Sequence, residues 1–175
     1  MKHIHVTPGA PCAHDGLLRF GTHRARCALG RAGVTANKVE GDKKTPLGSF
    51  QLRRIWYRPD RITRPENPLP TIQISPKSGW CDDVHANCYN RPIRRPSRFN
   101  HERLWRNDRL YDVFFELGYN DAPTKAGAGS AIFLHLEKAN FQPTLGCIAV
   151  SHASMAYLLR HATPDTMLTI NKKSS

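Results

Sequence analysis

The chain has 175 residues, a length that suits one domain with a hydrophobic core of its own. No stretch approaches the roughly 20 apolar residues of a membrane span, and the first nine residues lack the apolar core of a secretory signal. With 26 Lys and Arg against 14 Asp and Glu, the formal net charge is +12, and we expect a soluble chain that starts in the cytosol.

The positive charge lies in the first two-thirds of the chain. Lys and Arg outnumber Asp and Glu by 8 to 3 in residues 1–52 and by 13 to 6 in residues 53–109, whereas residues 110–175 carry 5 of each. A basic surface attracts a polyanion such as nucleic acid, a membrane surface or an anionic cell-wall polymer, but it also keeps a protein soluble. The charge alone therefore does not identify a binding partner.

In chain order, the regular segments are short and β-like, and turn residues such as those at 45–48 and 127–130 separate them. Many short strands without an internal repeat predict a mostly β fold, a sandwich or barrel. The expected strands are residues 17–20, 49–55, 69–74, 111–117, 131–135, 148–150 and 167–170.

Residues 76–107 interrupt this pattern as a long insertion. The segment is rich in Arg, Asn, Pro and aromatic residues and shows little hydrophobic periodicity. Disordered tails are poor in aromatic residues, so we expect an ordered loop here. Long ordered loops usually bind substrate or cover a site.

One helix is expected near the C-terminus, over residues 152–161. Ser151 is a suitable N-cap, and Pro164 prevents the helix from continuing. The apolar stripe of this helix consists of Met155, Leu158 and Leu159. A short helix thus follows the strand at 148–150 directly.

The five cysteines, at positions 12, 27, 81, 88 and 147, are odd in number and scattered. They do not form the dense disulfide framework of a small secreted domain, and at least one thiol stays unpaired in a monomer. Cys81 and Cys88 are near enough in sequence to pair or to share a metal, although no CxxC-type spacing supports a metal site.

Cys147 stands out among these cysteines because of its setting. It follows Gly146 and opens the apolar run at 148–150, and His135 lies twelve residues upstream at the end of another apolar run. We expect His135 at the edge of a sheet with Cys147 beside it on the next strand, where the imidazole can take the thiol proton. The backbone amides of Gly146 and Cys147 are candidates for an oxyanion hole. Either residue alone could be a core residue, but together they predict covalent acyl chemistry.

A second block supports a family resemblance. Lys38, residues 40–42 and residues 45–50, followed by His135 and the Gly146-Cys147 pair, resemble the L,D-transpeptidase family, whose catalytic domain is of the YkuD type. The insertion resembles a compact, single-domain branch of that family, and the likeness runs over about residues 17–170. It implies one catalytic domain over residues 1–175 with a β-rich fold, a short helix after the cysteine and a long loop insertion, and no cofactor or metal.

The resemblance also implies a reaction. Cys147 would attack a peptidoglycan stem-peptide amide next to a D-centre, and the thioester would pass to an amine acceptor, which crosslinks the cell wall. His135 would act first as general base and then as general acid, oriented by a backbone carbonyl. The implied partners are stem peptides that contain diaminopimelate and an anionic cell-wall polymer, with no nucleic acid, for a monomer that works in the periplasm.

The sequence departs from the family pattern near Cys147. Ala149 stands where an arginine is common, Leu145 precedes the glycine and Thr144 replaces a serine, so the substrate carboxylate needs another cation and the crosslink positions could be non-standard. The insertion offers Arg91, Arg94, Arg95 and Arg98 as such cations, or as solvated surface. The expected substrate-binding residues are Trp80, Tyr89, Asn90, Arg91, Arg95 and Thr144.

Three alternatives remain open. A cysteine amidase or carboxypeptidase would use the same pair of residues with water in place of the amine. A basic nucleic-acid-binding module would explain the charge with its interleaved Trp and Tyr residues. A metal-binding protein would use Cys81, His85 and Cys88 together with His135 or Cys147.

Overall fold

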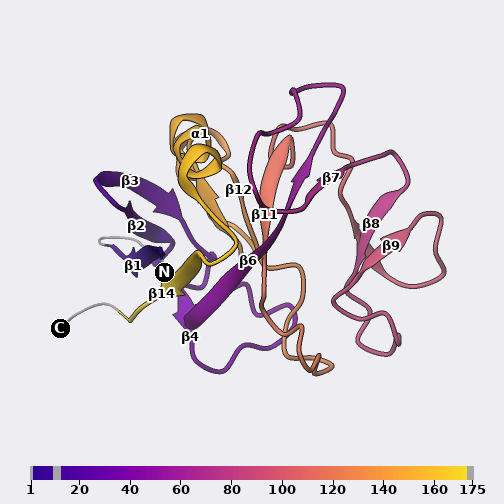
Figure 1. Cartoon of the computed structure of the whole chain (residues 1–175). Helices are drawn as coiled ribbons and strands as arrows, with labels where there is room; N and C mark the ends of the chain where they lie inside the picture. The colour runs from indigo at the N-terminus through magenta and orange to yellow at the C-terminus, as the bar shows by residue number, and fades with distance from the viewer. Residues whose placement is uncertain (1, 10–12, 173–175) are drawn as a thin grey trace.

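The computed structural model describes residues 2–9 and 13–172, and strands dominate it (Figure 1). Eight of the described strands form a closed ring, because β11 pairs with both β12 and β6. In order around the ring they are β6 (Gly48–Tyr57), β11 (Val113–Leu117), β12 (Phe133–Leu136), β13 (Ile148–Val150), β3 (His23–Ala28), β2 (Asp15–Phe20), β1 (His3–Pro8) and β14 (Met167–Ile170). The mostly β fold expected from the sequence is confirmed.

The other elements attach to this barrel. β7 (Thr71–Gln73) pairs with the end of β6, and β4 (Val34–Thr35) pairs with β5 (Thr45–Pro46). The insertion carries a small antiparallel sheet in the order β10 (His101–Arg103), β8 (Ser78–Cys81), β9 (Pro92–Arg94). This sheet stands on the side of the barrel away from the helix α1 (His152–His161), and a 3₁₀ turn, η1 (Ala139–Phe141), lies between β12 and β13 in sequence (Figure 1).

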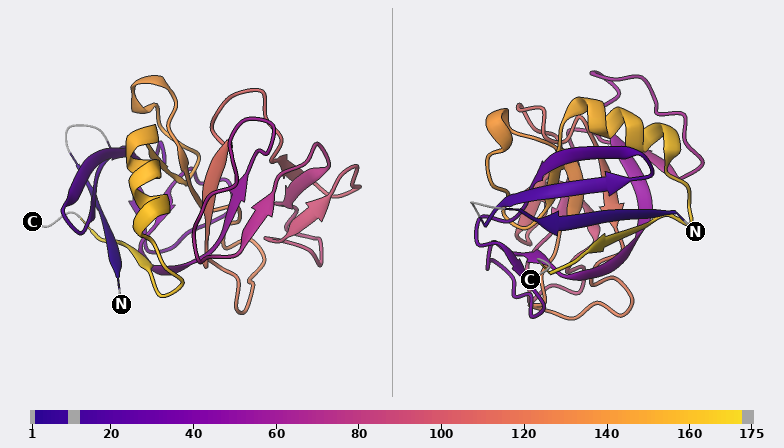
Figure 2. Two further views of the ribbon diagram at one scale, coloured as in Figure 1. Left: turned by 45° about the horizontal axis from the view of Figure 1, so that its top comes forward. Right: turned by 90° about the vertical axis from the view of Figure 1, so that its left-hand side faces the viewer.

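The helix begins and ends where the sequence predicts. The Ser151 hydroxyl accepts a hydrogen bond from the backbone N–H of Ser154 at 3.2 Å, which caps one of the free donors of the first turn. Met155 and Leu158 are buried in the main core, and α1 lies alongside β3 (Figure 2). The expected strands at 148–150 and 167–170 also have the predicted bounds.

Two apolar cores explain why the strands differ in burial. β2 and β14 alternate between buried and more exposed positions, because only their inner faces meet the core inside the barrel. In β11, β12 and β13 every residue is buried. The outer faces of β11 and β12 meet a second cluster made mainly of aromatic side chains from the barrel and the insertion: Trp56, Trp80, Tyr111, Phe114 and Phe133.

The structure corrects several expectations about the elements. The insertion is not only a loop, since β8, β9 and β10 are strands of three or four residues whose Gly, Pro and Arg content hides any alternation. β1 and β3 were not expected, because His and Arg occupy their exposed positions. β12 spans residues 133–136 and lies between β11 and β13, so the expectation that His135 sits at a sheet edge is wrong.

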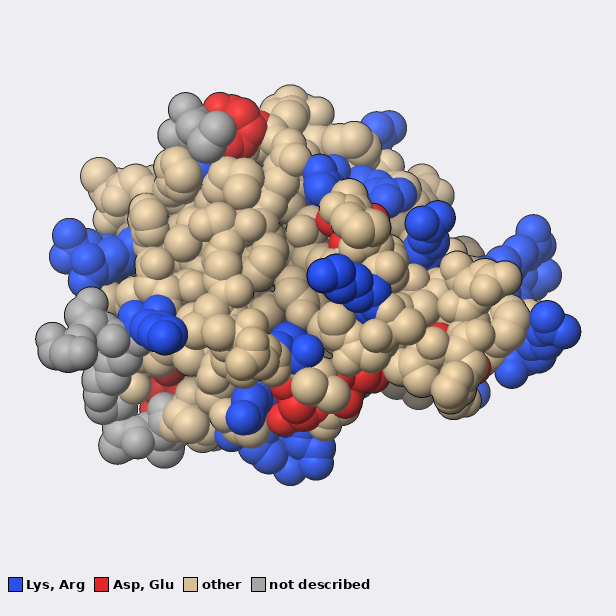
Figure 3. Space-filling view, turned by 90° about the horizontal axis from the view of Figure 1, so that it is seen from below, with Lys and Arg blue, Asp and Glu red and all other residues tan. Residues whose placement is uncertain are grey.

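Basic side chains are spread across the face seen in Figure 3, with acidic side chains among them. Several arginines of the middle third form ion pairs: Arg58 with Asp60 at 2.7 Å, Arg61 with Asp112 at 2.6 Å and Arg106 with Asp108 at 2.6 Å. No helix within residues 2–9 and 13–172 is long and apolar enough to cross a membrane.

Candidate active site

Cys147 lies in the turn before β13 and lines a cavity of about 550 Å³. The residue is 8% exposed. The thiol donates a hydrogen bond to the Ala131 carbonyl at 3.1 Å, and its sulfur accepts one from the backbone N–H of Phe133 at 3.3 Å. The chain entering β12 therefore holds the sulfur in place.

His135 lines the same cavity from β12. In the parallel pairing of β12 with β13 it lies opposite Ala149, two residues beyond the cysteine. Its Nδ1 lies 2.7 Å from the backbone oxygen of Leu136. A carbonyl can only accept, so Nδ1 carries the proton and Nε2 is left as the nitrogen able to accept one.

Burial keeps both groups neutral. It raises the pKa of the Cys147 thiol to about 12, an effect that nearby Glu102 reinforces and that the Phe133 amide and Lys38 oppose. It also lowers the pKa of His135 to about 4, although the Leu136 carbonyl favours the protonated ring. At neutral pH these shifts favour the thiol and the neutral imidazole, whose Nε2 can accept a proton.

The turn before Cys147 is closed by Thr144. Its hydroxyl donates to the Cys147 carbonyl at 2.7 Å and accepts from the Gly146 N–H at 3.1 Å. Gly146 has a φ of +143°, and a Cβ there would meet the Lys44 carbonyl at 3.0 Å, so only glycine suits the position. Thr144 lines the cavity, but its hydroxyl is engaged in the turn, where it also accepts the hydrogen bond of the Gly146 amide.

The block at 38–50 lies beneath this turn. The Thr45 hydroxyl lies 3.4 Å from the Cys147 carbonyl and accepts from the Gly30 N–H at 2.8 Å. Lys38, whose side chain is 4% exposed, pairs with Asp42 at 2.5 Å. The block therefore supports the cysteine turn from below, a role that its sequence alone did not reveal.

Trp80, Tyr89 and Asn90 are not surface residues that stack on a substrate, which corrects the sequence-based expectation. They are 4%, 3% and 6% exposed, and none of them lines the cavity around Cys147. The side-chain oxygen of Asn90 accepts from Trp80 Nε1 at 3.0 Å and from the Ala131 N–H at 3.1 Å. Asn90, which Trp80 holds in place, thus supports Ala131, whose carbonyl accepts the hydrogen bond of the Cys147 thiol.

Arg91 and Arg95 also lie away from the cavity. Arg91 lines a separate cavity of about 320 Å³. Arg95 donates to His101 Nε2 at 3.0 Å and to the Pro76 carbonyl at 3.1 Å, so it braces the insertion. The cations that do line the Cys147 cavity come from four separate segments, and the sequence carried no signal for them: Arg31, Lys43, Arg106 and Lys138.

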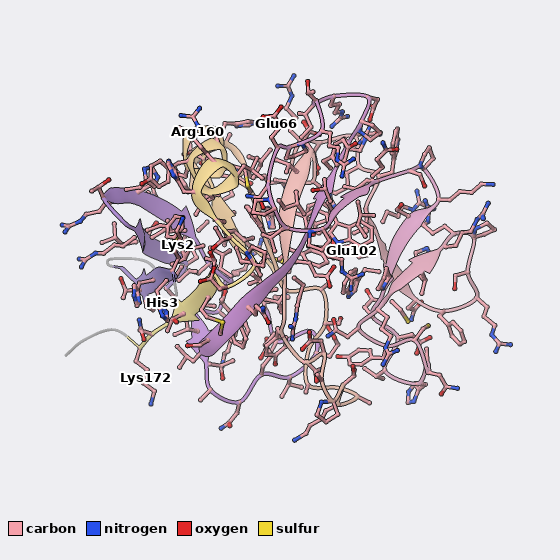
Figure 4. The ribbon with its side chains drawn as sticks, viewed as in Figure 1. Lys2, His3, Glu66, Glu102, Arg160 and Lys172 are labelled. Atoms are coloured by element: carbon pink, nitrogen blue, oxygen red, sulfur yellow. The ribbon has the colours of Figure 1, made fainter. Side chains whose placement is uncertain are left out.

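Carboxylates face the same cavity from the insertion side. Asp82 and Glu102 line it, and Figure 4 places Glu102 between the barrel and the small sheet. Glu102 accepts from the Tyr111 hydroxyl at 2.6 Å, and Asp82 Oδ1 is buried without a hydrogen-bond partner among the described residues. Burial raises the pKa of both carboxyl groups. The lining of the cavity thus combines carboxyl groups with the four cations.

The alternative of a metal-binding protein requires a cluster of metal-ligand side chains. Cys81 and Cys88 are in contact, but residues 2–9 and 13–172 hold no group of three or more His, Cys, Asp or Glu side chains arranged to bind a metal ion.

A family model of the YkuD type, described as the L,D-transpeptidase catalytic domain, matches residues 14–170. No curated protein sequence matches the chain.

Solved structures resemble the fold at low sequence identity. A variant of the helical cell shape determining protein Pgp2 from Campylobacter jejuni is 13% identical, with a TM-score of 0.50 over 99% of this chain and 48% of that one. L,D-transpeptidase 1 from Mycobacterium tuberculosis is 12% identical, with a TM-score of 0.39 over 97% of this chain and 62% of that one. The chain thus spans about half the length of the Pgp2 structure, and the likeness to it is one of fold.

We predict that Asn90→Ala lowers the free energy of unfolding by about 2–4 kcal/mol, because it leaves the buried Trp80 and Ala131 donors without an acceptor. Urea denaturation of the variant measures this loss. Asn171→Ala, at an exposed position, is the matched control and should stay within about 0.5 kcal/mol of the parent. Equal stability of the two variants would contradict the supporting role of Asn90.

The pH dependence of Cys147 alkylation reports its protonation state. With the pKa raised to about 12, the thiolate fraction should grow about tenfold per pH unit between pH 7 and pH 9. The rate of iodoacetamide labelling at Cys147, mapped by mass spectrometry, should follow that slope. In the urea-unfolded chain the rate should level off above about pH 8.5. A flat profile in the folded protein would instead indicate a resting thiolate–imidazolium pair.

Proposed function

Because the chain belongs to the family of L,D-transpeptidase catalytic domains, we propose that it is a peptidoglycan L,D-transpeptidase with Cys147 as nucleophile and His135 as acid–base. The observation that carries this proposal is the cavity of about 550 Å³ that Cys147 and His135 both line, with His135 Nδ1 fixed by a carbonyl. We further propose that the matched residues, 14–170, act as one catalytic domain.

The first half of the reaction forms a thioester. His135 Nε2 takes the thiol proton as the Cys147 sulfur attacks the carbonyl carbon of a stem-peptide amide. The C–N bond then breaks, and the imidazolium gives its proton to the leaving amine. Both groups begin neutral, so charge develops only during the transfer, inside a largely buried site.

The second half consumes the thioester. An acceptor amine attacks the thioester carbonyl, His135 takes the excess proton from the nitrogen, and the sulfur leaves to be reprotonated as the thiol. The amides of Gly146 and Cys147 are the proposed donors to the developing oxyanion. The Gly146 amide must then exchange its bond to the Thr144 hydroxyl for one to the substrate oxygen.

The charges around the cavity support substrates built on diaminopimelate. Arg31, Lys43 and Lys138 are the proposed partners of the donor carboxylate, in place of the arginine that Ala149 replaces. Asp82 and Glu102 are proposed to bind the ammonium group of the acceptor. A cavity wall that binds an amine acceptor favours transfer of the acyl group to that amine. The alternative, a cysteine amidase or carboxypeptidase, transfers it to water. Because these cations would hold the donor carboxylate from other positions than that arginine, the enzyme would join non-standard crosslink positions.

The place of action follows from the family. Enzymes with this domain act on the cell wall, typically outside the cytoplasm. We therefore propose a periplasmic monomer whose basic surface contacts an anionic cell-wall polymer, with no role for nucleic acid.

Acylation by a carbapenem tests the nucleophile. We expect the intact mass of the protein to increase by one drug molecule, and Cys147→Ala to abolish the adduct. Cys27→Ala, which removes another buried thiol, should leave the adduct unchanged. His135→Ala should slow acylation by about 10²-fold or more. An unmodified parent protein, or an equal adduct on Cys147→Ala, would overturn the proposal.

Glu102→Gln tests the acceptor site. With disaccharide-peptide donors and a diaminopimelate-containing acceptor, the variant should lose about tenfold in transfer, because an ammonium group loses a charged partner, while hydrolysis persists. A glutamine at this position can still accept the hydrogen bond from the Tyr111 hydroxyl, so we expect the variant to fold like the parent protein. Glu66→Gln, which lies near α1 and away from Glu102, is the charge-matched control (Figure 4). Products from the parent protein that arise by hydrolysis alone would favour the amidase alternative.

A further inference from the structure

Two cysteines of the insertion lie in direct contact. Cys81 ends β8, and Cys88 lies in the turn that follows it. The Cys88 thiol donates to the Cys81 sulfur with 3.1 Å between the two atoms. Both cysteines are reduced in this structure, as are Cys27 and Cys147. Cys12 lies outside the described residues.

Backbone hydrogen bonds already close the loop that joins the two sulfurs. The Cys81 N–H donates to the Arg91 carbonyl at 2.9 Å, and the Asn90 N–H donates to the Cys81 carbonyl at 2.9 Å. The Arg91 N–H in turn reaches the Cys88 carbonyl at 3.1 Å. To form a covalent bond the two sulfurs must move about 1 Å closer together, and side-chain rotation can supply this movement without opening the loop.

The two thiols differ in access. Cys81 is fully buried, and burial together with the contact to Cys88 raises its pKa to about 11. Cys88 is partly exposed. An oxidant from solution therefore meets Cys88 first, and Cys81 is placed behind it to resolve the intermediate.

We propose that Cys81 and Cys88 form an intramolecular disulfide by exchange with a small-molecule or protein disulfide. The Cys88 thiolate attacks one sulfur of the oxidant, whose S–S bond breaks to release one thiol. The Cys81 thiolate then attacks the Cys88 sulfur of the mixed disulfide and releases the second thiol. The two protons of the cysteines end on the two released thiols, and the oxidant is reduced by two electrons.

The disulfide would stabilise the support of the Cys147 cavity. Directly after Cys88 come Tyr89 and Asn90, and Asn90 holds the Ala131 N–H at 3.1 Å. The Ala131 carbonyl receives the Cys147 thiol. A covalent ring over residues 81–88 restricts the unfolded chain and keeps this support in place. This inference stands on the contact of the two sulfurs and is independent of the proposed function.

Mass spectrometry of the full chain tests the inference. The segment between the two cysteines contains no Lys or Arg, so trypsin leaves both in one peptide that begins after Lys77. After treatment with oxidised glutathione and alkylation by N-ethylmaleimide, that peptide should be unlabelled and about 2 Da lighter than its reduced form. The Tm should rise by about 4 °C or more, and dithiothreitol should reverse both changes.

Variants separate the pair from the other thiols. Cys88→Ser should abolish both the mass change and the rise in Tm, whereas Cys27→Ser, a control at another buried thiol, should keep both. Labelling of both Cys81 and Cys88 in the oxidised parent protein would overturn the inference. So would a crosslink from either residue to Cys12, Cys27 or Cys147, or stoichiometric zinc in the protein as purified.

Discussion

The parallel pairing of β12 with β13 is the contact on which the candidate site depends. It sets His135 opposite Ala149 and so brings the imidazole to the turn that carries Cys147. The start of β12 also holds the sulfur, through the Ala131 carbonyl just before the strand and the amide of Phe133, its first residue. A shift of one residue in this register would turn His135 toward the opposite face of the sheet and separate the two groups.

Burial of the outer face of the sheet shapes the chemistry of the site. The aromatic cluster that includes Trp80, Tyr111 and Phe133 covers β11 and β12, and Cys147 and His135 are both buried beside it. Charge separation is costly there, which explains why burial raises the pKa of one group and lowers that of the other. The insertion also contributes Asp82 and Glu102 to the cavity wall, so it supplies carboxyl groups to the site as well as covering it.

Local patterns were sufficient for part of the fold. The helix at 152–161 and the strands at 148–150 and 167–170 have the bounds that the sequence predicts. Helix caps, Pro and β-branched residues affect only the backbone of nearby residues, so their effect can be predicted from the local sequence. β1 and β3 were not predicted because His and Arg side chains occupy their exposed positions. β8 to β10 are too short to show a period at all.

The sequence by itself singled out Cys147 and His135 as a candidate pair, because a cysteine after a glycine and a histidine that ends an apolar run are the parts of an activated nucleophile. It also determined the family resemblance and the mostly β fold. Only the tertiary structure decided the roles of the surrounding residues. Trp80, Tyr89 and Asn90 suit a substrate site and a core equally well as sequence, but the fold buries all three, with Trp80 against Phe133 and Asn90 bound to the Ala131 N–H. Likewise the cavity cations come from segments far apart in sequence, which only the closure of the barrel and its insertion brings to one wall.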